Sequence, residues 1–333
     1  MEEMFKRYPV RTFLMLAFSI SWLIWALSPL LSMGDPQVQT MLDIIGLFTK
    51  AFFALIIMLR QADIPLMPPL RRHFSLFGIF TAILLFVMST GFIEIRVITV
   101  FLALLMADFL AYMAGMLFAH RHNTDFFGGA LSLLKTPWVI LPVLVFPIMF
   151  AISNLLSYLY GGHIFWPFYM GEVAIYQVFY VLLFIFFIFF GSALIIEPAY
   201  RGFLAPYLIK KMSPLFTGLV LGVLMTVWLA PLFINGFFGE AGLGLEQLQA
   251  TFNVLLWVVP LNVVLMWFYL RFKGVLWFAY LAHGSFFASL ILLPMSTERG
   301  IYVPVMLWGL ALLLSIFDRR MANAQQARFY LYK

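Results

Sequence analysis

Residues 214–236 read PLFTGLVLGVLMTVWLAPLFING, a stretch without one charged side chain. A helix needs about 20 mostly apolar residues to cross the roughly 30 Å hydrocarbon core of a bilayer, so this stretch is long enough to span it. Stretches of the same kind recur on both sides of it along the chain. The sequence therefore predicts an all-α, polytopic bundle of about ten transmembrane helices. The predicted spans are 12–33, 41–60, 74–92, 96–119, 136–160, 172–196, 214–236, 250–271, 275–294 and 301–317.

The composition points to the same class of protein. Of the 333 residues, 64% are hydrophobic and only 10% are charged, and the mean hydropathy is +1.02. A soluble domain carries about 25% charged residues, so these values exclude an ordinary soluble enzyme. The chain has no cysteine, which excludes disulfides, thiolate metal sites and a cysteine nucleophile. We expect residues 1–333 to form a single integral membrane domain without a separate soluble part.

The positions of the basic residues predict the orientation. With the N-terminus inside, all but three of the 20 lysines and arginines fall in cytoplasmic segments. The three exceptions are Arg96 and Arg299, which fall outside, and Lys50, which falls within the second span. Both termini are therefore predicted to be cytoplasmic. Basic inner loops facing anionic lipids account for the net charge of +6 without a nucleic-acid partner. No signal peptide and no large outer domain is expected, which suits a bacterial inner membrane.

Several polar residues fall at membrane depth, where each costs free energy and is a candidate for function. Asp43 and Lys50 are seven residues apart on one face of the second span, which favours an internal ion pair or snorkelling over a functional role. Asp108 stands on the fourth span, and its role stays open.

The seventh span carries a small residue at every fourth position. This stripe allows another helix to approach closely, either within the bundle or, as the lesser alternative, in a dimer. The stripe consists of Gly218, Gly222, Thr226 and Ala230.

Glu197 and Arg201 follow the sixth span in the segment IIEPAYRGFL (195–204). They are four residues apart, so their side chains can meet on one helix face and lower the cost of burying both charges. Pro198 between them kinks or re-aims the helix. Such a pair is more often structural than catalytic.

Together with LMTVWLAPLF (224–233) and LWFAYLAHGSFF (276–287), this segment resembles the CPBP family of CAAX-processing and bacteriocin-immunity-type intramembrane proteases. The family has three motifs, E-E-x-x-x-R, F-x-x-x-H and H-x-x-x-N. The segment SWLIW (21–25) also resembles the usual opening of the family. The resemblance covers a core at residues 172–290. It implies a carboxylate base that activates water, with polar donors that stabilise the oxyanion.

Residue by residue, the sequence keeps the order and spacing of the family motifs but lacks most of their catalytic side chains. Ile196 stands at the position of the catalytic glutamate, while Glu197 and Arg201 keep the second glutamate and the arginine. Met225 and Leu229 replace the phenylalanine and histidine of the second motif. His283 remains in the third motif, but Phe287 replaces its asparagine. Isoleucine, leucine and phenylalanine side chains cannot exchange a proton or donate a hydrogen bond.

Three functions follow as hypotheses. In the first, the protein is a non-catalytic member of the family that binds a membrane protein or a lipid-modified peptide in the old substrate cavity. In the second, it is an active endopeptidase that uses Glu197 and His283 with Arg201. In the third, it is a transporter or channel with a polar path through Asp43, Lys50, Asp108 and Glu197.

The expected cavity opens to the cytoplasm between the sixth, seventh and ninth spans. No cofactor is expected, and too few ligands come together for a metal site. Apart from membrane lipids, the expected partner is the membrane protein or lipid-modified peptide of the first hypothesis. The expected lining consists of Ile196, Glu197, Arg201, Leu229, His283 and Phe287.

Overall fold

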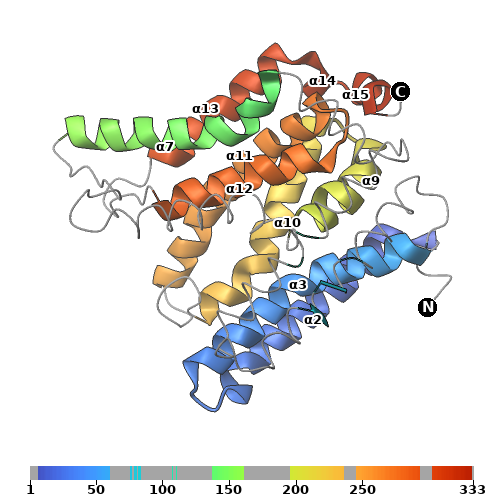
Figure 1. Cartoon of the computed structure of the whole chain (residues 1–333), viewed down its shortest axis with the longest axis vertical. Helices are drawn as coiled ribbons and strands as arrows, with labels where there is room; N and C mark the ends of the chain where they lie inside the picture. The colour runs from blue at the N-terminus through green and yellow to red at the C-terminus, as the bar shows by residue number, and fades with distance from the viewer. Residues whose placement is uncertain are drawn as a thin grey trace. The chain divides into compact units, whose positions relative to one another are not determined.

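The computed structural model describes residues 7–60, 137–160, 196–235, 245–292 and 302–331, and isolated positions between 76 and 110 (Figure 1). Across these residues the chain is helical and contains no strand, which confirms the all-α prediction. Most of the predicted third, fourth and sixth spans, and Asp108, lie outside the described residues.

Within the described ranges, four helices are long and apolar enough to cross a membrane. They cover Pro9–Leu31, Pro137–Leu159, Pro214–Ile234 and Phe252–Arg271. Their ends lie within a few residues of the first, fifth, seventh and eighth predicted spans. The agreement has a simple cause: in hydrocarbon a backbone must satisfy its own hydrogen bonds, so a long apolar run forms a helix. The chain is thus an α-helical membrane protein.

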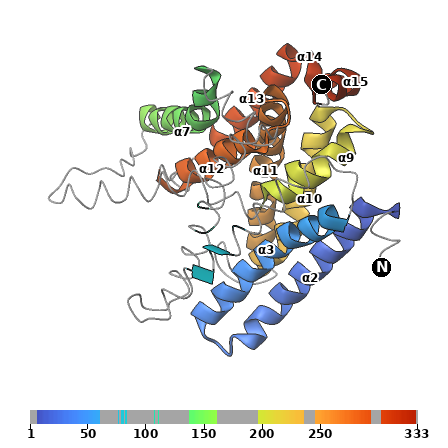
Figure 2. The same ribbon diagram turned by 45° about the vertical axis from the view of Figure 1, so that its right-hand side comes forward.

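The chain divides into two compact units. Unit 1 comprises Met1–Leu133, Leu194–Tyr207 and Leu224–Asn253. It contains a hairpin of α2 (Pro9–Leu31) and α3 (Pro36–Arg60), which lie side by side (Figures 1 and 2). The connection turns at Met33 and Gly34, whose φ angles are 51° and 84°. The π-helix η2 (Pro198–Leu204) packs on α3 and continues into α9 (Ala205–Ile209).

Unit 2 comprises Leu134–Ala193, Leu208–Val223 and Val254–Lys333. In it α7 (Leu141–Leu159), which follows the short η1 (Pro137–Ile140), packs on α12 (Leu276–Leu292). The ring of Phe286 lies 5.4 and 5.7 Å from the rings of Phe146 and Phe150, both centroid to centroid. The Ser285 hydroxyl donates to the carbonyl of Val143 at 2.5 Å. Aromatic packing and one buried hydrogen bond thus join the two helices.

Two glycines of α10 (Pro214–Ile234) lie against α11 (Leu245–Arg271) within unit 2. A Cβ atom on Gly222 would lie 2.5 Å from Cα of Val259, and one on Gly218 would lie 2.8 Å from Cα of Val263. Both distances are too short for a side chain, so the helices touch backbone to backbone. The predicted close approach is confirmed at these two positions, and the approaching helix belongs to the same chain.

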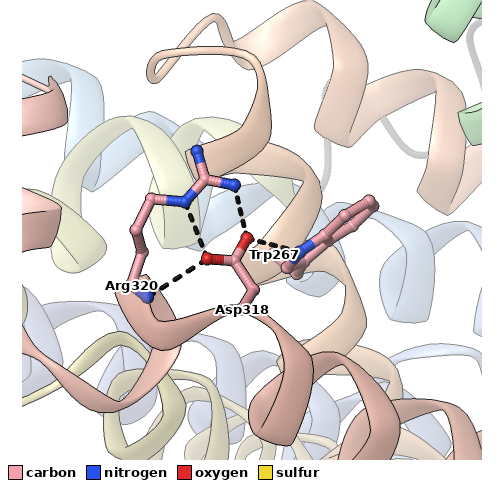
Figure 3. A network of polar contacts seen from close by, with 3 residues as sticks. All are labelled: Trp267, Asp318 and Arg320. Carbon is pink, nitrogen blue, oxygen red and sulfur yellow. Dashed lines mark hydrogen bonds and ion pairs between the residues drawn. The ribbon is translucent and has the colours of Figure 1, made fainter.

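Asp318 joins α11 to the junction of α13 (Tyr302–Phe317) and α14 (Arg319–Ala322), as Figure 3 shows. Its carboxylate accepts hydrogen bonds from Nε1 of Trp267 at 2.9 Å and from Nε of Arg320 at 2.7 Å. A second guanidinium nitrogen of Arg320 completes a bidentate ion pair, and the Arg320 backbone donates at 3.1 Å. Such paired, charge-assisted bonds hold the chain as it leaves α13.

These contacts predict a pH-dependent stability. Burial raises the pKa of the Asp318 carboxyl. The hydrogen bonds and charge of Arg320, together with the Trp267 hydrogen bond, lower it by more, so the pKa lies below its ordinary value. The unfolded chain therefore binds this proton more readily than the folded chain does. The stabilisation is complete above about pH 4, the ordinary range of aspartate, and is lost as the pH falls through the lowered pKa.

We expect the melting temperature of the wild type to fall more steeply with acidification than that of Asp318→Asn. Asparagine keeps an oxygen to cap α14 but has no proton to gain. Melting curves of both proteins between about pH 6 and pH 3 test this, because that interval brackets the ordinary aspartate pKa. Parallel curves would contradict it.

Candidate functional site

The candidate site is a group of buried charged residues in unit 1. Its centre is the ion pair between Arg201 and Glu197, with 3.0 Å between Nη1 and Oε1. Both side chains are completely buried, with 0% exposed surface. The predicted contact on one helix face is confirmed. The helix at this point is a π-helix, a rare form that often accompanies functional sites and begins here at Pro198.

Lys50 is the third charged group of this site. Its amino nitrogen lies 3.6 Å from the ring centroid of Trp228 on α10 and 4.9 Å from that of Tyr200 on η2. Only 1% of the Lys50 surface is exposed, and no hydrogen-bond partner for its nitrogen exists among the described residues. The two ring faces replace part of the hydration that the ammonium loses. Glu197 and Arg201 are close enough for their charges to act on it.

Of the two arrangements expected for Asp43 and Lys50, an internal ion pair or snorkelling, the ion pair is wrong. Within the described part of the chain the two side chains make no such contact. Asp43 instead accepts a hydrogen bond from the Ser28 hydroxyl at 2.7 Å, and its backbone carbonyl accepts one from the Trp25 indole at 2.9 Å. Lys50 instead faces Trp228 and Tyr200, which belong to other helices. The spacing of residues along one helix cannot predict contacts with side chains of another helix.

A network of hydrogen bonds holds the aromatic wall of the site. The indole of Trp228 donates to the hydroxyl of Ser21 at 3.0 Å, and Ser21 also contacts the hydroxyl of Thr49. The ring of Trp25 lies 4.9 Å from that of Trp228. Asn235 donates from Nδ2 to the carbonyl of Trp25 at 2.6 Å. Trp228 is therefore fixed by α2 and α3, and it presents its face to Lys50.

Apolar side chains fill the positions that the family resemblance assigns to catalysis. Ile196 and Leu229, both in unit 1, are buried, with 6% and 7% of their surfaces exposed. Neither side chain can transfer a proton. Met225, which stands at the phenylalanine of the second motif, is also buried, with 2% exposed. Glu197 is the carboxylate of this segment, and its partner Arg201 lies one turn away.

His283 and Phe287 belong to unit 2, on α12. His283 is completely buried, and its ring stacks on that of Phe287, with 5.0 Å between centroids and 20° between planes. The structure thus brings together Glu197 and Arg201 in one unit and His283 and Phe287 in the other. The convergence of all the predicted lining residues on one cavity stays a prediction.

The described residues contain no group of three or more histidine, cysteine, aspartate or glutamate side chains that could hold a metal ion. What the site of unit 1 offers chemically is a carboxylate neutralised by a guanidinium and an ammonium held between aromatic rings. The sequence did not single out Tyr200, Trp228 or Ser21. A usable signal existed: Tyr200 and Trp228 each stand directly before a family-motif position, Arg201 and Leu229.

No protein-family model matches this chain, and no curated protein matches it either.

Proposed function

We propose that the protein is a CPBP-like integral membrane protein without proteolytic activity, which binds a membrane protein or a lipid-modified peptide. The observation that carries the proposal is the fully buried ion pair of Glu197 with Arg201. A general base for peptide hydrolysis must reach the attacking water and release its charge as it takes the proton. The Glu197 carboxylate is completely buried and hydrogen-bonded to the Arg201 guanidinium, so it is not placed to reach such a water.

The apolar residues at the lost catalytic positions support the same proposal. Ile196 and Leu229 bury hydrocarbon where proteolysis needs a carboxylate and a polar donor. Replacing buried catalytic groups by apolar ones removes the desolvation cost of an active site. A substrate cavity that has lost its catalytic side chains but kept the arrangement of its helices could still bind an apolar chain.

We also propose the ten-span topology with both termini in the cytoplasm, in a bacterial inner membrane. Contacts inside unit 1 support it, because they join segments that the topology assigns to one side. The rings of Phe13 and Phe203, both assigned to the inner side, lie 5.1 Å apart. At the outer side, Asn235 receives a hydrogen bond from Gln39 at 3.3 Å and donates one to Trp25.

Unit 2 supports the topology in the same way. The guanidinium of Arg271 lies 5.3 Å from the ring centroid of Trp138, and both residues belong to inner ends of spans in the proposed order. The bond from Trp267 to Asp318 joins the inner ends of the eighth and tenth spans.

The function is tested with purified protein in lipid nanodiscs and a fluorescent farnesylated peptide. We expect saturable binding by fluorescence anisotropy, no binding of the same peptide without the lipid, and no cleavage by mass spectrometry. Leu229→Phe, which narrows the proposed cavity, should weaken binding. Val227→Phe on the same helix, at a side chain that is 44% exposed, is the matched control and should bind as the wild type does.

Cleavage of the peptide that is lost in both Glu197→Gln and His283→Ala would establish the endopeptidase alternative and end the proposal. Equal binding of the peptide with and without its lipid would also end it. A substrate-dependent flux through proteoliposomes would favour a transporter instead.

A further inference from the structure

A shallow hollow of about 510 Å³ lies where α13 gives way to α14 and α15 (Ala324–Leu331) in unit 2. A volume of this size falls within the range of small-molecule sites. One part of its lining is polar and consists of Ser315, Arg319, Asn323, Gln325 and Gln326. Ile316 lies on the apolar part. The hollow therefore suits a ligand with a polar, anionic head next to an apolar chain.

Arg319 is the charged group of the hollow, and its guanidinium is available. Its side chain is exposed, and it makes no hydrogen bond or ion pair with any residue that the structure describes. The adjacent Arg320 is different, because Asp318 neutralises it in a bidentate pair (Figure 3). A guanidinium presents several donors in a fork that matches the oxygens of a phosphate.

The end of α13, next to Arg319, carries exposed apolar side chains. Ile316 and Phe317 are 70% and 81% exposed, and Leu312 and Leu313, one turn earlier, are 58% and 53% exposed. Side chains of this kind at the end of an apolar helix face acyl chains. In the proposed topology the hollow then lies at the depth of the lipid headgroups of the cytoplasmic leaflet, where anionic lipids concentrate around basic residues.

We infer that this hollow binds the headgroup of an anionic phospholipid, with Arg319 on the phosphate and the exposed apolar end of α13 along the acyl chains. The amides of Gln325 and Gln326 are placed to meet the remaining polar groups of the head. This inference rests on the proposed topology and is independent of the proposed peptide binding.

The test measures lipid binding to the detergent-solubilised full chain by native mass spectrometry and by the shift of its melting temperature. Dioleoylphosphatidylglycerol is compared with dioleoylphosphatidylcholine and with inorganic phosphate. We expect the phosphatidylglycerol to bind and to raise the melting temperature, and the other two to have little effect. Losing the charged hydrogen bonds of Arg319 in Arg319→Ala should weaken phosphatidylglycerol binding about tenfold or more.

Arg11→Ala is the matched control, because it removes the same charge from an exposed arginine on the same proposed side of the membrane. It should bind the lipid as the wild type does. Gln326→Glu adds a negative charge to the hollow and should weaken binding like Arg319→Ala, which keeps the test decisive if one variant fails to fold. Equal losses in the Arg11 and Arg319 variants would overturn the inference in favour of diffuse charge attraction. Equal binding of inorganic phosphate or of phosphatidylcholine would overturn it as well.

Discussion

Replacing Glu197 by methionine is expected to destabilise the protein by about 3–5 kcal/mol, because it breaks a buried ion pair and leaves its partner uncompensated. The effect should be at the upper end of this range. Arg201 and Lys50 are both buried, and without Glu197 two positive charges remain together in an apolar surrounding.

Arg201→Met is expected to cost less than Glu197→Met. After that change Glu197 still has a cation in its surroundings, since Lys50 packs between Trp228 and Tyr200. The double variant Glu197→Met with Arg201→Met removes both charges and should recover most of the stability, as apolar replacements of buried ion pairs often do.

The measurement is reversible unfolding in mixed micelles of dodecylmaltoside and sodium dodecyl sulfate, followed by tryptophan fluorescence. The three variants and the wild type form a double-mutant cycle, which isolates the energy of the pair. Arg11→Met, at an exposed arginine, controls for the loss of a charge. Single variants within about 1 kcal/mol of the wild type, the range of exposed ion pairs, would contradict the buried charge cluster.

Gly222→Ala is the second change with a large expected effect. The new methyl group would lie 2.5 Å from Cα of Val259 and 3.1 Å from the carbonyl oxygen of Val258, so backbone rather than a flexible side chain opposes it. The helices must separate to admit it, and we expect a destabilisation of about 1–3 kcal/mol, the cost of overpacking a core.

Gly309→Ala on α13 is the matched control, because a Cβ at Gly309 meets no atom within 4 Å. Both changes replace a helical glycine by alanine and share the gain in helix propensity of roughly 0.5–1 kcal/mol. Their difference in unfolding free energy therefore measures the helix contact alone. If Gly222→Ala stabilised the protein as much as Gly309→Ala, the close approach of α10 to α11 would be wrong.

The candidate site was only partly visible in the sequence. The pairing of Glu197 with Arg201 could be predicted, because residues four apart on a helix are neighbours. The partner of Lys50 could not be predicted. The spacing to Asp43 suggested an ion pair, but an aromatic contact across helices requires knowing that Trp228, far away in the chain, packs against α3.

The stripe on α10 shows the same division. Small residues four apart predict that some helix approaches closely, and the structure confirms this at Gly218 and Gly222. The sequence offered both a neighbour in the bundle and a second copy of the chain as the partner. The structure shows that the backbone of α11 lies against both glycines. The sequence could not select this partner, because the choice depends on how distant segments fold together.

The sequence alone determined that this is an α-helical membrane protein, and it located to within a few residues the four membrane-length helices found among the described residues. The reason is local: a chain in hydrocarbon must close its hydrogen bonds within each segment, so composition over about 20 residues suffices. The tertiary structure decided which side chains meet across helices, such as Lys50 with Trp228 and Asp318 with Trp267. Those contacts depend on distances between segments far apart in the chain, and no local pattern encodes them.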